Sequence, residues 1–178
     1  MKKYLILVLV MNCFAFDLNY INKAMQDKDW AKVCKNEVYD RARAKQDDGL
    51  MNAYGKACLE LDYISKLNPV ITALVKTPEA RMNAMFYTTI LYKKKLLYAA
   101  LIDGVDISAI KLPKCDYVLS DIYDDYVNKK FEKIDDKYIF NYNGLKCEVS
   151  VKKTSHYDKV IFKIIDNEGK VIKTKEYW

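Results

Sequence analysis

The sequence predicts an α+β fold in which an N-terminal helical array packs with a C-terminal four-stranded antiparallel meander. Apolar residues recur at helical spacing through most of the chain up to about residue 130. From residue 137 onward they alternate with polar residues, as they do in strands that bury one face. We therefore expect a signal peptide over 1–15, a helical domain over 16–132 and a small antiparallel β-sheet domain over 133–178.

The opening stretch MKKYLILVLVMNCFA is organised like a secretory signal peptide. Lys2 and Lys3 precede a short apolar run, and Cys13 and Ala15 are small enough for the −3 and −1 positions before a cleavage site after Ala15. The run is too short to span a bilayer, which needs roughly 20 apolar residues. Lipid attachment at Cys13 and an uncleaved anchor are the two alternatives. The expected location is the periplasm.

Cleavage leaves about 163 residues with a formal charge of +4. That length fits one domain of ordinary size or two small domains that share a core. A mildly basic balance usually favours solubility rather than a nucleic-acid site. We expect no nucleic-acid partner and no transmembrane span in the mature chain.

Four cysteines remain after cleavage, and an even number in an oxidising compartment predicts two disulfides. Four cysteines allow three connectivities, and buried free thiols are the alternative if the compartment is reducing. The chain has no Cys-x-x-Cys pair and a single histidine, His156, so no zinc site is predicted. The four are Cys34, Cys58, Cys115 and Cys147.

The first helices are predicted from apolar spacing and from the residues that interrupt it. Asp29 can cap a helix over residues 30–45, and Asp47-Asp48-Gly49 breaks it. A second helix is expected over residues 50–67, and Asn68-Pro69 should end or kink it before a short helix over residues 69–76.

Thr77-Pro78-Glu79 is a strong helix start, because threonine caps and proline suits the first helical position. This helix should run to Asp103 and end at Gly104. Its middle is apolar on most sides, so we expect a buried central post. Lys93-Lys94-Lys95 within it argues against a membrane span.

A last helix is expected over residues 116–130, followed by four strands. Asn143-Gly144 is the preferred two-residue hairpin signal between the first two strands. The predicted strands cover residues 137–142, 145–152, 160–166 and 170–178.

Part of the helical region resembles a tetratricopeptide-type helix hairpin, over roughly 40 of the 178 residues. About eleven extra residues separate the two halves of the motif, and no second clean repeat follows. The resemblance implies a protein-interaction scaffold in which Cys34 lies against Cys58 and forms a disulfide with it. The matching positions are Trp30, Val33-Cys34, Ala57, Leu61, Ile64 and Pro69.

The whole chain, rich in lysine, asparagine and tyrosine, also resembles small periplasmic proteins of Campylobacter-like bacteria. Several of these are accessory parts of envelope machines, including the periplasmic disks of the flagellar motor. This resemblance implies one or more protein partners in the envelope.

Cys115 and Cys147 form the second expected pair. Cys115 lies at a predicted helix start, and Cys147 points inward from a strand on which that helix packs. A bridge there would close a loop of about 30 residues and contribute roughly 3 kcal/mol. Cys115 is also the thiol whose position best suits a depressed pKa, as a thiol–disulfide enzyme would need.

No catalytic residue, cofactor or metal site is predicted. His156 lies in a turn beside Ser155 and near Asp158, where adjacent residues rarely form a triad. The chain has no glycine-rich phosphate loop.

Tyrosines in the second half of the chain have two interpretations. They can form an exposed protein interface, or they can pack the helix–sheet junction with their hydroxyls at the surface. The candidate interface residues are Tyr117, Tyr123, Tyr126, Tyr177 and Trp178.

The sequence thus predicts a non-enzymatic exported interaction or scaffold protein in a cell-envelope assembly. The alternatives are a ligand-binding or enzyme-inhibiting protein that uses a groove between helices and sheet, and a thiol–disulfide enzyme. The sequence predicts no oligomeric state.

Overall fold

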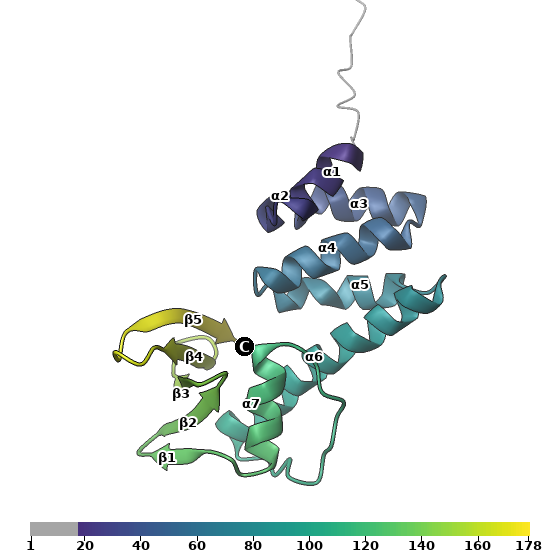
Figure 1. Ribbon diagram of the computed structural model, residues 1–178. Helices are drawn as coiled ribbons and strands as arrows, with labels where there is room; N and C mark the ends of the chain where they lie inside the picture. Colours follow the sequence, from purple (N-terminus) through teal and green to yellow (C-terminus); the bar gives the residue numbers. More distant parts are fainter. Residues whose placement is uncertain (1–17) are drawn as a thin grey trace, which may run out of the picture.

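The computed structural model describes residues 18–178, which fold into an N-terminal stack of helices and a C-terminal antiparallel sheet (Figure 1). The α+β prediction is confirmed. The expected signal peptide, its cleavage position after Ala15 and Cys13 lie outside the described residues. The helices are α1 (Leu18–Gln26), α2 (Trp30–Val33), α3 (Asn36–Lys45), α4 (Asp48–Glu60), the 3₁₀-helix η1 (Ile64–Lys66), α5 (Leu67–Ala73), α6 (Pro78–Asp103) and α7 (Val118–Val127).

The helix expected over residues 30–45 is in fact two helices, α2 and α3. The break falls at Cys34 and Lys35, where Lys35 has an extended backbone (φ −102°, ψ 149°). Helix α1 precedes them and was not predicted. The interruption lets the chain turn at Cys34, which is bonded to Cys58 on α4.

The second predicted helix also ends earlier than expected, because α4 stops at Glu60. Asp62 has a left-handed backbone (φ 63°), which aspartate tolerates better than most residues. The chain then re-enters a helix at η1 and α5. Pro69 lies in the first turn of α5, where its missing N–H leaves no helical hydrogen bond unmade.

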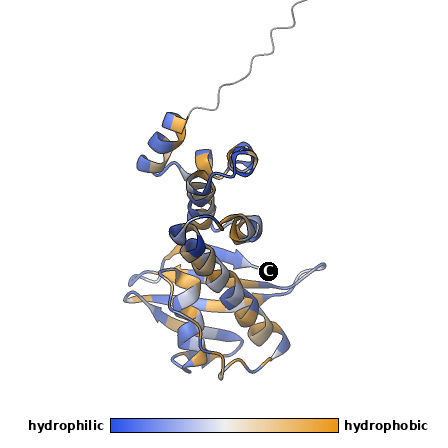
Figure 2. Cartoon of the chain, turned by 90° about the vertical axis from the view of Figure 1, so that its right-hand side faces the viewer, coloured by the Kyte–Doolittle hydropathy of each residue, from blue (hydrophilic) through white to orange (hydrophobic). Residues whose placement is uncertain are grey.

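Helix α6 has the predicted boundaries and is the post that connects the helical stack to the sheet (Figure 2). The Thr77 hydroxyl accepts a hydrogen bond from the Ala80 N–H at 3.0 Å, and Gly104 ends the helix in a left-handed conformation (φ 70°). The helix is not buried on all sides, since Met82 and Met85 are more than half exposed.

Five strands, rather than four, form an open antiparallel sheet in the order β1-β2-β3-β4-β5. The additional strand pairs with β2 through a turn in which Asp135 has a positive φ. It escaped prediction because it has only three residues, all exposed, and therefore no alternating apolar pattern. The strands are β1 (Glu132–Ile134), β2 (Lys137–Tyr142), β3 (Leu145–Lys152), β4 (Lys159–Ile165) and β5 (Val171–Tyr177).

One continuous core joins the helices and the sheet. On the sheet, Phe140, Cys147 and Ile164 are cross-strand neighbours on β2, β3 and β4, and all three are buried. Helix α7 contacts both α6 and β2, so it lies between the post and the sheet. Within residues 18–178, no helix combines the length and apolar character that crossing a membrane requires.

Candidate functional site at the helix–sheet junction

A cleft of 690 Å³ lies where the helical stack meets the sheet. Helices α4 and α6 form one wall, and the start of α7 with strands β2, β4 and β5 forms the other. Ligand pockets typically have volumes of roughly 300–1,000 Å³. The lining residues are Asn52, Lys56, Leu59, Glu60, Asn83, Phe86, Tyr87, Asp116, Tyr117, Val118, Tyr142, Ile164, Lys173 and Lys175.

The wall formed by α4 presents polar side chains in a row. Asn52, Lys56 and Glu60 are four residues apart, a spacing that places them on one face of a helix. The buried Tyr87 of α6 donates a hydrogen bond from its hydroxyl to Asn52 Oδ1 at 3.0 Å. Burial raises the pKa of Tyr87, so this phenol remains a hydrogen-bond donor at neutral pH.

Gly55 allows α4 to approach α5 and α6 closely behind this wall. A Cβ atom at this position would lie 2.9 Å from Val70 Cγ1 and 3.0 Å from Tyr87 Cε2. The first distance is shorter than real Cβ contacts, and the second is shorter than most of them. The absence of a side chain at Gly55 therefore fixes the place of Tyr87 in the cleft.

A polar junction centred on Asp62 connects the helical stack with the last strand. The Lys175 ammonium lies 2.6 Å from Asp62 Oδ1, and the Tyr177 hydroxyl donates to the same oxygen at 3.3 Å. Tyr117, just before α7, also donates its hydroxyl to Asp62. The Lys175 ammonium lies 4.8 Å from the centre of the Tyr117 ring. We call these four residues the Asp62 junction.

Burial shifts the pKa values of the three side chains that surround Asp62. It lowers the pKa of Lys175, an effect that the hydrogen bond and charge of Asp62 oppose. Burial, reinforced by the Asp62 charge, raises the pKa of Tyr117, and burial with the neighbouring Tyr117 and Asp62 does the same for Tyr177. Both phenols therefore stay protonated and donate to the carboxylate.

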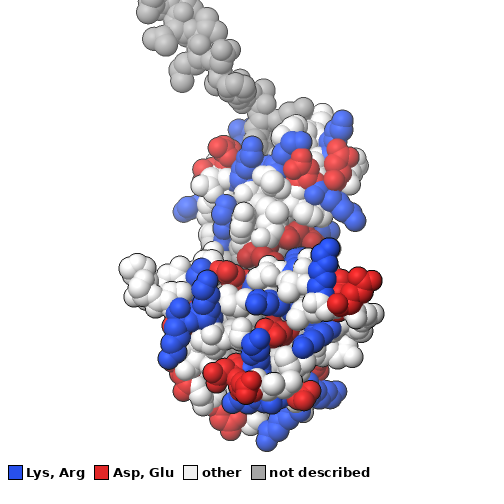
Figure 3. Space-filling view, turned by 90° about the vertical axis from the view of Figure 1, so that its left-hand side faces the viewer, with Lys and Arg blue, Asp and Glu red and all other residues white. Residues whose placement is uncertain are grey.

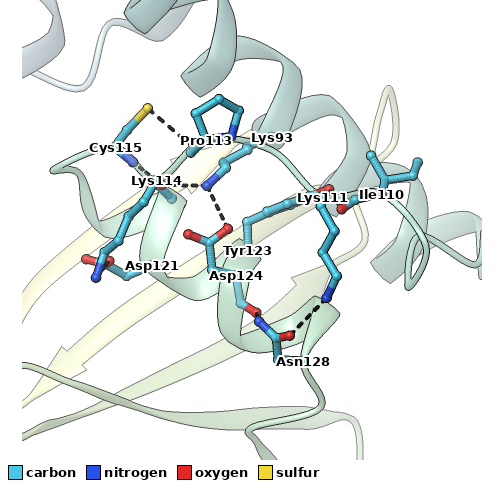
Figure 4. A network of polar contacts seen from close by, with 11 residues as sticks. Lys93, Ile110, Lys111, Pro113, Lys114, Cys115, Asp121, Tyr123, Asp124 and Asn128 are labelled. Carbon is cyan, nitrogen blue, oxygen red and sulfur yellow. Dashed lines mark hydrogen bonds and ion pairs between the residues drawn. The ribbon is translucent and has the colours of Figure 1, made fainter.

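A second polar network lies between α6 and α7 and is centred on Lys93 (Figure 4). The Lys93 side chain is fully buried, and its ammonium donates to Ser120 Oγ at 2.8 Å and to Asp124 Oδ1 at 2.7 Å. The ammonium lies 5.1 Å from the centre of the Tyr123 ring. Ser120 Oγ also accepts a hydrogen bond from the Cys115 N–H at 3.0 Å.

A serine beside a lysine can act as a nucleophile with its base. Ser120 is fully buried, however, and its oxygen already accepts two hydrogen bonds. No substrate atom can reach that oxygen without opening the α6–α7 interface. The Lys93 network therefore holds α7 on α6.

The cysteines are only partly arranged as expected. Cys34 and Cys58 form a disulfide with a Cα–Cα distance of 5.0 Å, as the helix-hairpin resemblance implied. The expected Cys115–Cys147 bridge is absent, and both residues are buried free thiols. Cys115 precedes the first residue of α7, while Cys147 lies within the middle strand of the sheet between Phe140 and Ile164.

Cys115 lacks the depressed pKa that the thiol–disulfide enzyme alternative requires. Burial raises the pKa of Cys115. Burial, with the charge of Glu148, raises the pKa of Cys147 to about 12. Both thiols therefore stay protonated at neutral pH, which makes them poor nucleophiles.

The five candidate interface residues differ in their exposure and contacts, so they do not form one exposed surface. Tyr123 and Tyr177 are buried, so they cannot form the exposed interface that was one expectation. Tyr123 donates its hydroxyl to the Ile110 carbonyl at 2.9 Å. Tyr126 stacks on Phe131, with ring centres 5.4 Å apart. Tyr117 belongs to the Asp62 junction, and Trp178 is 48% exposed.

Sequence reasoning missed the residues at the centre of both networks. Lys93 falls between the buried residues Ile90 and Leu97 at helical spacing, and this position could have signalled its burial. Asp62 carries no comparable signal, because its partners lie 55 to 115 residues further along the chain.

Acidic and basic side chains are interspersed over the face that Figure 3 shows. This mixed surface lacks the single-sign patch that is typical of nucleic-acid binding. Within residues 18–178, no three or more His, Cys, Asp or Glu side chains gather as they would around a metal ion. Comparisons with protein-family models, with curated proteins and with solved structures found no match to this chain.

Proposed function

We propose that this chain is a non-enzymatic, exported binding protein that holds a segment of a partner polypeptide in the cleft between its helices and its sheet. The observation that carries the proposal is the cleft itself. Two parts of the chain form it jointly, and the Asp62 junction fixes their relative position. A partner at this position would contact both parts at once.

The Cys34–Cys58 disulfide supports the exported location. Structural disulfides persist in oxidising compartments such as the periplasm and are rare in the cytosol. The bridge connects α4, which forms one wall of the cleft, to the turn between α2 and α3. A role in a cell-envelope assembly, including one of the flagellar motor, follows only from the resemblance to small periplasmic proteins.

The charges in the cleft indicate the chemistry of the partner segment. Lys56 and Lys173 line opposite walls and are exposed. Neither belongs to any ion pair formed within residues 18–178. Phe86 and Tyr142 add aromatic surface to the same cleft. We therefore expect an extended segment that carries an acidic side chain next to an apolar or aromatic one.

Charge reversal tests this proposal. The variant Lys56→Glu/Lys173→Glu should lose the partner that the wild-type protein retains when both are purified from their own envelope after cross-linking. Lys146→Glu is the matched control, because Lys146 is exposed on β3 and does not line the cleft. Equal recovery of the same partner by all three proteins would contradict the proposed site.

The volume of the cleft also supports a second candidate, a small-molecule-binding protein. Native mass spectrometry of the protein purified from its own envelope distinguishes the two. A bound small molecule that the double charge-reversal variant loses would favour this second function. A stable protein complex with the same dependence on Lys56 and Lys173 would favour the first.

A further inference from the structure

A second, smaller pocket of 200 Å³ lies beside the end of β5 and holds the side chain of Lys94. Its walls come from the turn after α4, from α6 and from the last residues of the chain. Lys94 is only 7% exposed, whereas its neighbour Lys95 is exposed. The other lining residues are Asp62, Tyr63, Ile64, Ser65, Lys66, Glu176, Tyr177 and Trp178.

The two carboxylates in this pocket are bound to other lysines. Asp62 is paired with Lys175 at 2.6 Å, and Glu176 is paired with Lys159 at 2.8 Å. No ion pair or hydrogen bond formed within residues 18–178 includes the Lys94 ammonium. Its polar contact is with the face of the Trp178 ring, 5.7 Å from the ring centre.

The Lys94 nitrogen nevertheless remains accessible from the pocket. Within residues 18–178, every fully buried side-chain nitrogen or oxygen has a hydrogen-bond partner. Lys94 Nζ has none, so it must keep contact with solvent.

The surroundings make the neutral amine easier to form than it is for a lysine in water. Burial, reinforced by the positive charge of Lys95, lowers the pKa of Lys94 to about 8. Contact with an indole face favours the charged ammonium, but the loss of water is the larger effect. Lys66 also lines the pocket, but its ammonium donates to the Cys34 carbonyl at 3.4 Å. A neutral lysine amine in an apolar pocket is the form that attacks carbonyl groups.

We propose that Lys94 is a nucleophilic amine and that the pocket beside Trp178 is a site at which a small aldehyde or ketone forms an imine with it. The Nζ lone pair attacks the carbonyl carbon and forms a C–N bond, the electrons of the C=O π bond move to the oxygen, and that oxygen takes up a proton as the nitrogen loses one. The resulting carbinolamine loses one water molecule and leaves a C=N bond to Nζ. This step needs no oxidant or reductant, and water reverses it. The pocket volume limits the carbonyl compound to a small one.

The test compares Lys94 with Lys95 in the same folded molecule. Propanal and cyanoborohydride convert an imine into a stable propyl-lysine, which mass spectrometry locates after digestion by a protease that does not cleave at lysine. At pH 7.5, a pKa near 8 rather than 10.5 gives a few hundredfold more free amine. Because the enclosed pocket slows approach, we expect Lys94 to react about tenfold faster than Lys95 or more.

Two controls connect this reactivity to the pocket. In denaturing urea, the two lysines should react at equal rates. In the folded protein, the rate at Lys94 should rise with pH, reach half of its maximum near pH 8 and level off above that, while the rate at Lys95 continues to rise. Equal rates at both lysines in the folded protein, or no propyl group on Lys94, would overturn the proposal.

Discussion

Lys175 Nζ lies 2.6 Å from Asp62 Oδ1, although 113 residues separate the two in the chain. Asp62 is in the turn after α4, and Lys175 is on the last strand, so the pair holds the helical stack against the sheet. The Lys175 side chain is 5% exposed and that of Asp62 is 20% exposed. A buried cation with one carboxylate partner depends strongly on that partner.

Replacing Asp62 should therefore destabilise the fold. Asp62→Ala leaves Lys175 buried without a counter-charge, and we expect a loss of about 3–5 kcal/mol in the free energy of unfolding. Glu176→Gln, next to Lys175 on β5, breaks the more exposed pair with Lys159 of β4 and should cost less than about 1 kcal/mol. Urea denaturation followed by circular dichroism measures both. A similar loss in the two variants would show that the Asp62–Lys175 pair contributes no more to stability than the more exposed Glu176–Lys159 pair.

The Lys93–Asp124 pair should respond unequally to loss of its two members. Asp124→Ala leaves a fully buried ammonium and should cost about 3–5 kcal/mol of stability. Lys93→Met retains most of the side-chain volume and leaves a carboxylate that is 28% exposed to water, so its cost should be about 1 kcal/mol or less. Urea denaturation of both variants gives the ranking. A larger loss of stability in Lys93→Met than in Asp124→Ala would contradict the prediction.

Gly55→Ala should destabilise the protein although alanine favours helices. The added Cβ would meet Val70 and Tyr87 at distances that require both side chains to move. We expect a cost of about 1–3 kcal/mol, as for other overpacked cores. Gly49→Ala in the first turn of the same helix meets only Asp47 Oδ1, at 3.3 Å, and should change stability by less than about 1 kcal/mol. Thermal unfolding of both variants measures the difference, and equal melting temperatures would refute the close contact.

Alkylation should distinguish two kinds of cysteine within residues 18–178. After denaturation without reductant, iodoacetamide should label Cys115 and Cys147 and leave Cys34 and Cys58 unlabelled. In the folded protein, Cys115 and Cys147 should react slowly even at pH 8, because burial raises their pKa values and leaves little thiolate. Peptide mass spectrometry reads both experiments. Full protection of all four cysteines would indicate a second disulfide.

Lys94 should make stability depend on pH. Its pKa is about 8 in the folded state and about 10.5 when unfolded. Below pH 8 both states hold the proton, and the buried charge destabilises the fold. Between pH 8 and 10.5 the unfolded state holds the proton at this residue more often than the folded state does, so the contribution of Lys94 to stability should rise with pH, while the buried thiols of Cys115 and Cys147 act in the opposite direction in the wild type and in the variants alike.

The measurement is the free energy of unfolding between pH 7.5 and 9.5, compared with that of Lys94→Met. The variant should be more stable than the wild type at pH 7.5 and should lose the part of the rise that Lys94 causes. Lys95→Met is the control and should keep the rise. The range stops at pH 9.5 because phenols such as Tyr87, whose pKa values are raised in the fold, reverse the slope when they ionise in the unfolded chain. Parallel curves for the wild type and Lys94→Met would contradict the prediction.

Elements with strong local signals were predictable from the sequence. Thr77-Pro78 and Gly104 define both ends of α6, and Asn143-Gly144 defines the turn between β2 and β3. Each signal depends on backbone preferences of one or two residues, which act without the rest of the fold. Strand β1 lacks such a signal, since three exposed residues form a strand only because β2 provides a partner.

The cysteines show the same difference between features that local sequence predicts and features that depend on the rest of the fold. The Cys34–Cys58 bridge joins the turn between α2 and α3 to α4, the next helix along the chain, so a local resemblance was enough to imply it. The Cys115–Cys147 prediction required knowing how the start of α7 meets β3. In the structure, Cys115 and Cys147 are both free thiols.

The sequence by itself determined the fold class, the α6 post and the order of the four longer strands, because periodicity, caps and turn residues act over a few positions. The tertiary structure alone decided the cleft, the Asp62 junction and the buried state of Lys93 and Lys94. All of these depend on contacts between side chains that are far apart in the chain. Three consecutive lysines show this, because each of them has a different environment in the fold. Lys93 is paired and fully buried, Lys94 lies unpaired in a pocket, and Lys95 is in water.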